Sequence, residues 1–189
     1  MATGSTNTIG FSADTLKHLM LDAGAVYKNY GLVGEALMGA TSGGCEFDIT
    51  PKTRDIKADG IKGAWKGGTQ IVNTDVTLKI NFLELTVDIL KAALMADVDT
   101  TTNVGYSTIT GRTSIELTDY IDNIALVSTL SGSTTPVIII LKNALSADGI
   151  KFSSKDSQDN ILPCTFTAHI DPTTPTVSSY EIRYPTLTA

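Results

Sequence analysis

The chain has 189 residues, a formal net charge of −6 at pH 7, and 42% hydrophobic and 18% charged residues. This length suits one domain with a sizeable core, and so apolar a composition excludes a disordered chain. The negative net charge argues against a protein that binds nucleic acid, because such proteins need a basic face to neutralise phosphate. An acidic surface would instead let DNA pass without adsorbing it.

The N-terminal residues are small and polar. Residues 1–8 have neither a basic start nor an apolar run, so no signal peptide is expected. We predict an N-terminal arm over residues 1–23, with a short helix that begins at Asp14 and ends at Gly24, and a single domain over residues 24–189. The most apolar run, residues 137–141, is far shorter than the roughly 20 residues of a membrane helix.

Two strand-like segments follow the arm. Residues 40–44 have the composition of a turn, and Cys45, Phe47 and Ile49 then alternate with polar residues. Pro51 interrupts this strand and indicates a bulge or an edge position, since proline cannot donate to the ladder. The alternation resumes at Arg54 and runs into a glycine-rich loop over residues 60–68.

The clearest pattern in the chain follows this loop. Apolar and polar residues alternate over residues 71–82, which predicts a long strand with one buried and one wet face. The buried face is expected to carry Val72, Thr74, Val76, Leu78, Ile80 and Phe82, and the wet face Ile71, Asn73, Asp75, Thr77, Lys79 and Asn81. Thr86 and Asp88 then mark the start of a helix over residues 86–95.

The two strands on either side of the loop are predicted to form a hairpin with an oversized tip. This pairing would bring Asp55, Lys57 and Asp59 close to Asp75 and Lys79, with opposite charges on neighbouring strands. The polar face of such a hairpin is either an ordinary solvent-facing sheet or the wall of a wet channel.

The remainder of the chain is predicted to form loops and short strands. We expect a loop over residues 96–103, a weak strand or a loop over 107–119, and strands near 124–128, 137–141, 150–152, 164–170 and 179–184. Runs of strands with one helix indicate a mainly β fold, namely a β-sandwich or partly closed barrel with one flanking α-helix and an extended loop. Cys45 and Cys164 are predicted to be buried reduced thiols, with a disulfide as the alternative.

No pattern in the chain indicates catalysis. The glycine-rich stretches lack the Gly-Lys-Ser/Thr ending of a phosphate loop, and no serine lies in a nucleophile-elbow sequence. His18 and His169 have no third ligand at a zinc spacing, and Asp97, Asp99 and Asn103 lack the glycine and glutamate of a calcium loop. We therefore predict a protein that is not an enzyme and needs no cofactor or metal.

Four stretches resemble a known family. Residues 24–27, 37–47, 54–63 and 83–86 resemble, in order and spacing, the major tail tube proteins of long-tailed, siphovirus-type bacteriophages. The resemblance covers about residues 24–95 and is only architectural afterwards. It implies a small β-sandwich with a flanking helix, similar to the tube protein of type VI secretion, whose copies form hexameric rings that stack into a tube for DNA.

The family also implies roles for particular residues. A stacking loop over about residues 58–69 would reach the next ring, with Gly60, Ile61, Lys62, Gly63, Ala64, Trp65, Lys66, Gly67 and Gly68. The face expected to line the lumen carries Asp55, Lys57, Asp59, Asn73, Asp75, Thr77, Lys79 and Asn81. Trp65, the chain's only tryptophan, is the residue type that anchors interfaces.

The expected partners are other copies of the chain, together with tape measure, tail terminator and distal tail proteins, while double-stranded DNA passes without specific binding and no membrane is involved. The expected location is the virion tail, assembled in the host cytoplasm. Two alternatives remain at this point. One is another virion role, such as a tail-end or head decoration protein. The other is a carbohydrate-binding or adhesin sandwich module, which would need exposed aromatic residues in a groove, whereas only 6% of the residues are aromatic.

Overall fold

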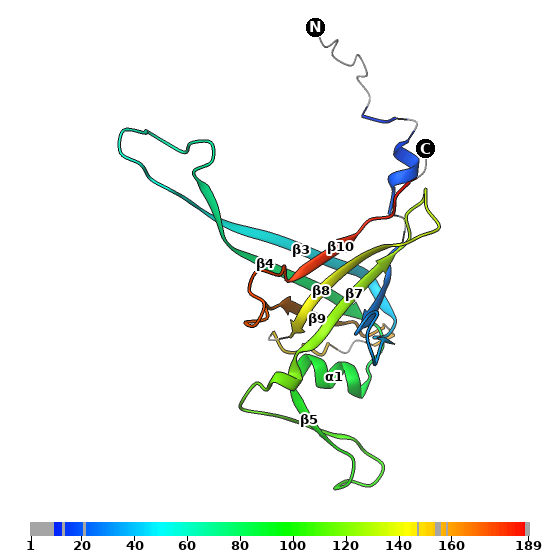
Figure 1. Cartoon of the computed structure of the whole chain (residues 1–189). Helices are drawn as coiled ribbons and strands as arrows, with labels where there is room; N and C mark the ends of the chain where they lie inside the picture. Colours follow the sequence, from blue (N-terminus) through cyan, green and yellow to red (C-terminus); the bar gives the residue numbers. More distant parts are fainter. Residues whose placement is uncertain are drawn as a thin grey trace.

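The computed structural model describes residues 10–12, 14–20, 22–146, 148–153, 156–157 and 159–187. The fold is mainly β (Figure 1). Its strands are β1 (Ala25–Lys28), β2 (Ala36–Leu37), β3 (Thr41–Asp55), β4 (Thr69–Phe82), β5 (Ala96–Asp99), β6 (Thr108–Gly111), β7 (Ile121–Ser128), β8 (Val137–Leu145), β9 (Leu162–Ala168) and β10 (Tyr180–Arg183). Its helices are α1 (Val87–Leu94) and the short 3-10 segments η1 (Thr15–His18) and η2 (Leu117–Asp119).

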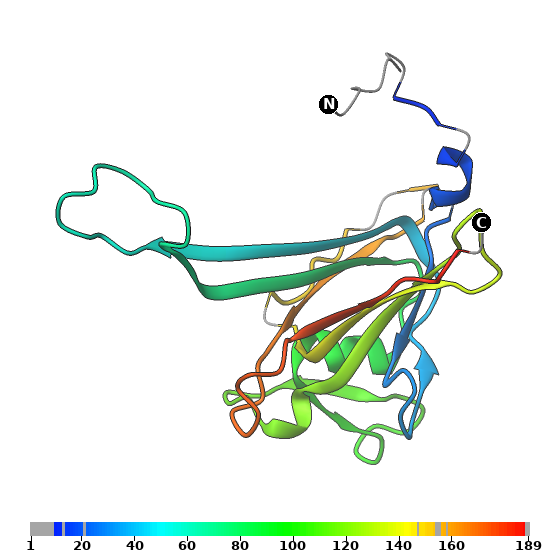
Figure 2. The ribbon, with the colours of Figure 1, turned by 45° about the horizontal axis from the view of Figure 1, so that its top comes forward.

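Eight of the described strands form one antiparallel sheet in the order β2-β1-β7-β8-β9-β4-β3, with β10 paired to β8 off this path. The sheet does not close into a barrel. Its two parts, β10-β8-β7-β1 and β9-β4-β3, are joined where Ala144 and Leu145 of β8 pair with Ala168 and Thr167 of β9. The two parts lie over one another and enclose the core, so the arrangement is sandwich-like (Figure 2). Strands β5 and β6 form a separate hairpin.

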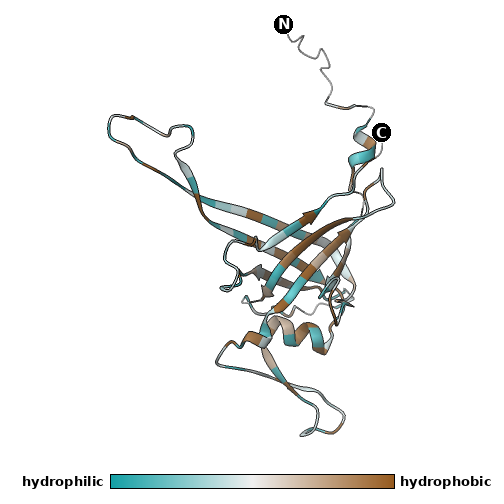
Figure 3. Cartoon of the chain, in the orientation of Figure 1, coloured by the Kyte–Doolittle hydropathy of each residue, from teal (hydrophilic) through white to brown (hydrophobic). Residues whose placement is uncertain are grey.

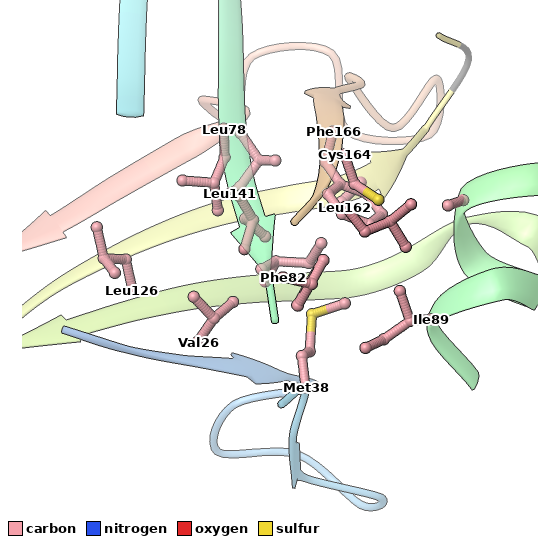
Figure 4. Close-up of a cluster of buried hydrophobic side chains, with 14 of the residues drawn as sticks. Val26, Met38, Leu78, Phe82, Ile89, Leu126, Leu141, Leu162, Cys164 and Phe166 are labelled. Carbon is pink, nitrogen blue, oxygen red and sulfur yellow. The ribbon is translucent and has the colours of Figure 1, made fainter. Parts of the chain in front are cut away.

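The core lies between the two parts of the sheet and is closed at one end by α1 (Figure 4). The predicted alternation of β4 is confirmed over its second half, because Val76, Leu78, Ile80 and Phe82 are all fully buried. They meet side chains of the opposite part and of α1, namely Val26, Ile124, Leu126, Leu141, Ile89 and Ala93. Val72, also predicted to be buried, is 63% exposed because β4 has left the body of the protein at this point.

The helix over residues 86–95 is confirmed. The Thr86 hydroxyl accepts a hydrogen bond from the Ile89 backbone N–H at 3.2 Å, which caps the N-terminus. Met95 ends the helix in the left-handed region, with φ 51°. Ile89 and Ala93 form the buried face of the helix, whereas Val87 is 38% exposed.

Three predictions in the first half of the chain are wrong. In place of a helix over residues 14–24, the described residues there form only the 3-10 segment η1, and residues 13 and 21 lie outside the description. Residues 40–44 are not a separate turn, because β3 already begins at Thr41. The register of β3 against β4 shifts between Thr41 and Cys45, where Gly43 and Gly44 have positive φ angles. Pro51 does not interrupt β3, which is continuous, but its predicted edge position is confirmed.

Later elements are partly as expected. The loop predicted over residues 96–103 begins with β5, the weak strand is β6, and Ile115 and Leu117 are exposed side chains outside it. Residues 150–152 are not a strand. The strands near 124–128, 137–141, 164–170 and 179–184 are confirmed as β7, β8, β9 and β10. Residues 137–141 are central, since β8 pairs with β7, β9 and β10.

Both cysteines are free thiols. Cys45 and Cys164 each pair with Ile80, from opposite sides of β4. Two strand spacings separate their Cα atoms by roughly 9–10 Å, beyond the ~7 Å that a disulfide can span. Burial raises the pKa of the Cys164 thiol to about 11 and raises that of Cys45 as well. The described residues include no helix long and apolar enough to cross a membrane.

Candidate functional site

The most distinctive feature of the molecule is a hairpin that leaves the body. Strands β3 and β4 continue past the core as a two-stranded ribbon that ends in a wide loop (Figures 1 and 2). From residue 51 to residue 73 every residue except Gly68 is exposed. Ile71 and Val72 are 68% and 63% exposed, so the ribbon presents apolar side chains without a cover. Both faces of the ribbon are therefore bare over this length.

A β-bulge changes the direction of the ribbon before its tip. Lys52 pairs with Asn73 and Thr53 pairs with Ile71, which leaves Val72 as an extra residue on β4. Such a bulge increases the local twist and turns the strand. The bulge therefore sets the angle at which the tip leaves the body.

The tip is a folded loop with its own internal contacts. Trp65 donates its indole N–H to the carbonyl oxygen of Ile56 at 3.0 Å. The Ile56 N–H donates to the Gly68 carbonyl at 2.7 Å, and the Gly68 N–H donates to the Trp65 carbonyl at 2.9 Å. A Cβ atom at Gly68 would lie only 2.5 Å from the indole ring, so the ring rests directly on this glycine. Trp65 thus closes the neck of the loop.

The indole ring of Trp65 is thus held by the loop and is also partly exposed. Trp65 is 36% exposed, while Ile61, at the far side of the loop, is 49% exposed. Ile61 therefore has the larger exposed fraction of the two, and Trp65 shapes the loop that carries it. The clasp was not foreseen, because nothing in the residue pattern shows that an indole ring folds back onto Gly68.

The tip is basic although the chain is acidic. Residues 56–68 hold Lys57, Lys62 and Lys66 against Asp59, a net charge of +2, whereas the whole chain carries −6. Within the described residues, none of these three lysines forms an ion pair. The charge of the tip is therefore opposite in sign to that of the chain as a whole.

The second candidate surface is the outer face of β3, β4 and β9. Because paired residues share a face, Glu46, Asp48, Thr50 and Lys52 of β3 lie beside the polar residues of β4. Thr165 and Thr167 extend this face onto β9. The lysines are partly neutralised: Lys52 Nζ lies 2.5 Å from Asp75, and Lys79 Nζ lies 4.0 Å from Glu46. Figure 3 shows the mainly hydrophilic colouring along the hairpin, in contrast to the apolar strands β7 and β8.

The predicted set of lumen residues is brought together only in part. Asn73, Asp75, Thr77, Lys79 and Asn81 do share the outer face of β4. The predicted proximity of Asp55, Lys57 and Asp59 to Asp75 and Lys79 is wrong, because the true neighbours of Asp75 and Lys79 are Thr50 and Glu46. Asp55 lies at the neck of the tip, where it accepts a hydrogen bond from the Thr69 hydroxyl at 2.7 Å. Lys57 and Asp59 lie in the tip loop itself.

The error has a simple origin. The predicted register starts a new strand after Pro51, whereas β3 runs from Thr41 through Pro51 without a break. Glu46, Asp48, Thr50 and Lys52 therefore supply the cross-strand partners of β4. Alternation of Glu46 and Asp48 with Cys45, Phe47 and Ile49 was the signal that could have placed them.

The two histidines make separate contacts. His18 Nδ1 lies 2.9 Å from the Tyr184 hydroxyl, and the His169 ring packs edge-to-face on Tyr120 with centroids 5.2 Å apart. Hydrogen bonds from the side chain and backbone of Thr101 and from Thr102 hold the pKa of Asp99 well below its usual range. The described part of the chain contains no group of three His, Cys, Asp or Glu side chains placed to hold a metal ion.

A groove of about 610 Å³ lies beside α1, lined in part by Leu37, Met38, Val87 and Ile89. Lys28 and Asp88 form an ion pair across it at 2.9 Å. Its lining contains no aromatic side chain, so it lacks the flat surface on which a sugar ring would stack.

No protein-family model matches the chain, and no curated protein matches it.

Proposed function

We propose that this chain is a structural protein of a bacteriophage tail, which assembles into stacked rings that form the tube for viral DNA. The observation that carries the proposal is the bare hairpin over residues 51–73. An isolated domain derives no stability from a ribbon that touches none of its core, and its exposed apolar residues invite aggregation. In a stack of copies the same ribbon becomes the contact between one ring and the next.

The outer face of β3, β4 and β9 supports the same role. It is rich in hydroxyl and amide groups and holds Glu46, Asp48 and Asp75 against Lys52, Arg54 and Lys79. Continued through identical neighbours, such a face would line a wet bore whose lysines are already paired with carboxylates, so that the genome slides without adsorbing. The resemblance of residues 24–95 to tail tube proteins implies six copies in each ring.

The remaining parts of the proposal follow from this role. The partners are other copies of the chain, with tape measure, tail terminator and distal tail proteins at the ends and in the bore. The location is the virion tail, after assembly in the host cytoplasm. A tail-end or head decoration role is the rival from the same class, and it predicts assemblies that do not lengthen into tubes. The groove beside α1 has no aromatic lining, so that groove gives no support to a carbohydrate-binding module.

Shortening of the hairpin tests the proposal. Replacement of residues 57–67 by an Asn-Gly turn should leave the body folded, because the core lies outside the hairpin. The native chain should sediment as large, concentration-dependent particles, and the shortened chain as single rings or monomers. If both chains sediment identically as monomers at every concentration, the proposed function is wrong.

A further inference from the structure

The long edge of β3 is open. Among the described strands β3 pairs only with β4, so the other edge of its 15 residues is unpaired. Cys45, Phe47 and Ile49 point towards the core but are only partly buried, since no strand lies beyond them. An open edge of this length is a template for a further strand.

The backbone groups offered by this edge can be worked out. The Leu83 N–H donates to the Ala40 carbonyl at 2.8 Å, so the backbone N–H and C=O groups of odd-numbered β4 residues face β3. From Cys45 onwards these odd-numbered residues of β4 lie opposite even-numbered residues of β3, which therefore direct their own backbone groups towards β4. The odd-numbered residues of β3, from Cys45 to Ile49, therefore point their N–H and C=O groups outwards. Pro51 is consistent with this assignment. Its nitrogen has no hydrogen to donate, and as an odd-numbered residue it faces the open edge and leaves no hydrogen bond to β4 unmade.

A second open edge belongs to β10. Among the described strands β10 pairs only with β8. The Lys142 N–H donates to the Ser179 carbonyl at 2.8 Å. Because backbone groups alternate along a strand, Glu181 and Arg183 also direct their N–H and C=O groups towards β8. Tyr180 and Ile182 then direct their backbone groups outwards. Their side chains lie on the core side of the sheet, opposite Leu141 and Ile139, and Ile182 is 48% exposed.

We infer that β10 of one copy pairs antiparallel with β3 of the next copy, with Ile182 opposite Ile49 and Arg183 opposite Asp48. The inference rests on the proposed function, because it names the edges that join neighbours within a ring. On both strands the residues with outward backbone groups carry core-side side chains, so Ile182 would complete the burial of Ile49. Two different edges make a head-to-tail contact, which closes into a ring when the rotation permits.

The charged side chains favour this alignment of β10 with β3 over the neighbouring ones. Asp48 accepts a hydrogen bond from the Thr50 hydroxyl at 2.9 Å and forms no ion pair with any described residue, so its carboxylate is available to Arg183. A shift of two residues in one direction would set Glu181 against Asp48. A shift in the other direction would set Ile182 against Pro51, which cannot donate. Parallel pairing with Arg183 at Asp48 would set Glu181 against Glu46.

Disulfide trapping tests the pairing. The variants Asp48→Cys/Arg183→Cys and Thr50→Cys/Glu181→Cys, each in a Cys45→Ala background, place thiols at directly opposed positions. The second pair leaves the proposed contact between Asp48 and Arg183 in place. The control is Lys52→Cys/Arg183→Cys on the same face, where four residues at ~3.4 Å each exceed the reach of a disulfide.

We expect mild oxidation of assembled protein to give a ladder of covalently linked copies for both opposed pairs and not for the control. Assemblies seen by electron microscopy without linked copies, or with equal linkage in the control, would overturn the β3–β10 pairing and leave the proposed function standing. A parent protein that forms no assemblies would overturn both.

Discussion

The indole ring of Trp65 rests on the backbone of Gly68 and donates its N–H to Ile56, so one side chain ties together both strands at the neck of the hairpin tip. Gly68 is the one buried residue of the exposed hairpin over residues 51–73. The glycine is required there for space, because any Cβ would enter the ring.

Substitution of Gly68 tests the clasp. Gly68→Ala should displace the Trp65 ring, because the new methyl group would lie 2.5 Å from it. We expect a red shift of tryptophan fluorescence and shorter tubes, with a change of less than about 0.5 kcal/mol in the free energy of unfolding, since the tip lies away from the core. Gly111→Ala is the control, because a Cβ there meets no atom within 4 Å. An unchanged emission spectrum would show that the ring does not occupy this position.

The division of roles between Trp65 and Ile61 can be separated by two variants. Trp65→Ala removes the clasp, and Ile61→Ala removes a side chain that is 49% exposed without touching the clasp. Both chains should remain folded and both should lose tube length, but only Trp65→Ala should increase proteolytic cleavage within residues 56–68. Val104→Ala, at a side chain 96% exposed outside the hairpin, is the control. Tubes of normal length from both tip variants would remove the tip from the stacking contact.

The alternation of β4 predicts a steep contrast in stability. Phe82→Ala should lower the free energy of unfolding by about 3–5 kcal/mol, because the ring is fully buried against the core. Val72→Ala, on the same strand but at the bulge, should change it by less than about 0.5 kcal/mol. Urea denaturation followed by circular dichroism measures both values. Equal losses would mean that the hairpin is packed against the body.

The buried thiol of Cys164 predicts a dependence of stability on pH. Burial raises its pKa from 9.0 to about 11, so between these values the folded state retains a proton that the unfolded state has lost. The contribution of this group is therefore fully present below pH 9 and is lost as the pH rises towards 11. Cys164→Ala should have a shallower decline of stability over this window than the native chain. A steeper or identical decline would contradict a protonated buried thiol.

Much of the fold could be predicted because strong local patterns decided it. The alternation from Val76 to Phe82 and the Thr86 cap of α1 are local signals that the core then confirms. The register of β3 against β4 could not be obtained this way. It depends on the bulge at Val72 and on the continuity of β3 through Pro51, and both arise from pairing between distant segments.

Only the local features of the candidate site could be predicted from the sequence. The loop over residues 60–68 and the polar residues of β4 followed from composition and alternation. The open edges of β3 and β10 are set by the order of strands in the sheet, which separates Ile49 from Ile182 by most of the chain. Their relationship becomes visible only when the direction of each backbone bond is known.

The most direct test of the central claim is a negative-stain image of the purified native chain at high concentration. The account predicts stacked rings with a central channel that lengthen into tubes. A field of single particles of monomer size, unchanged when nucleating tail-tip complex is added, would contradict it.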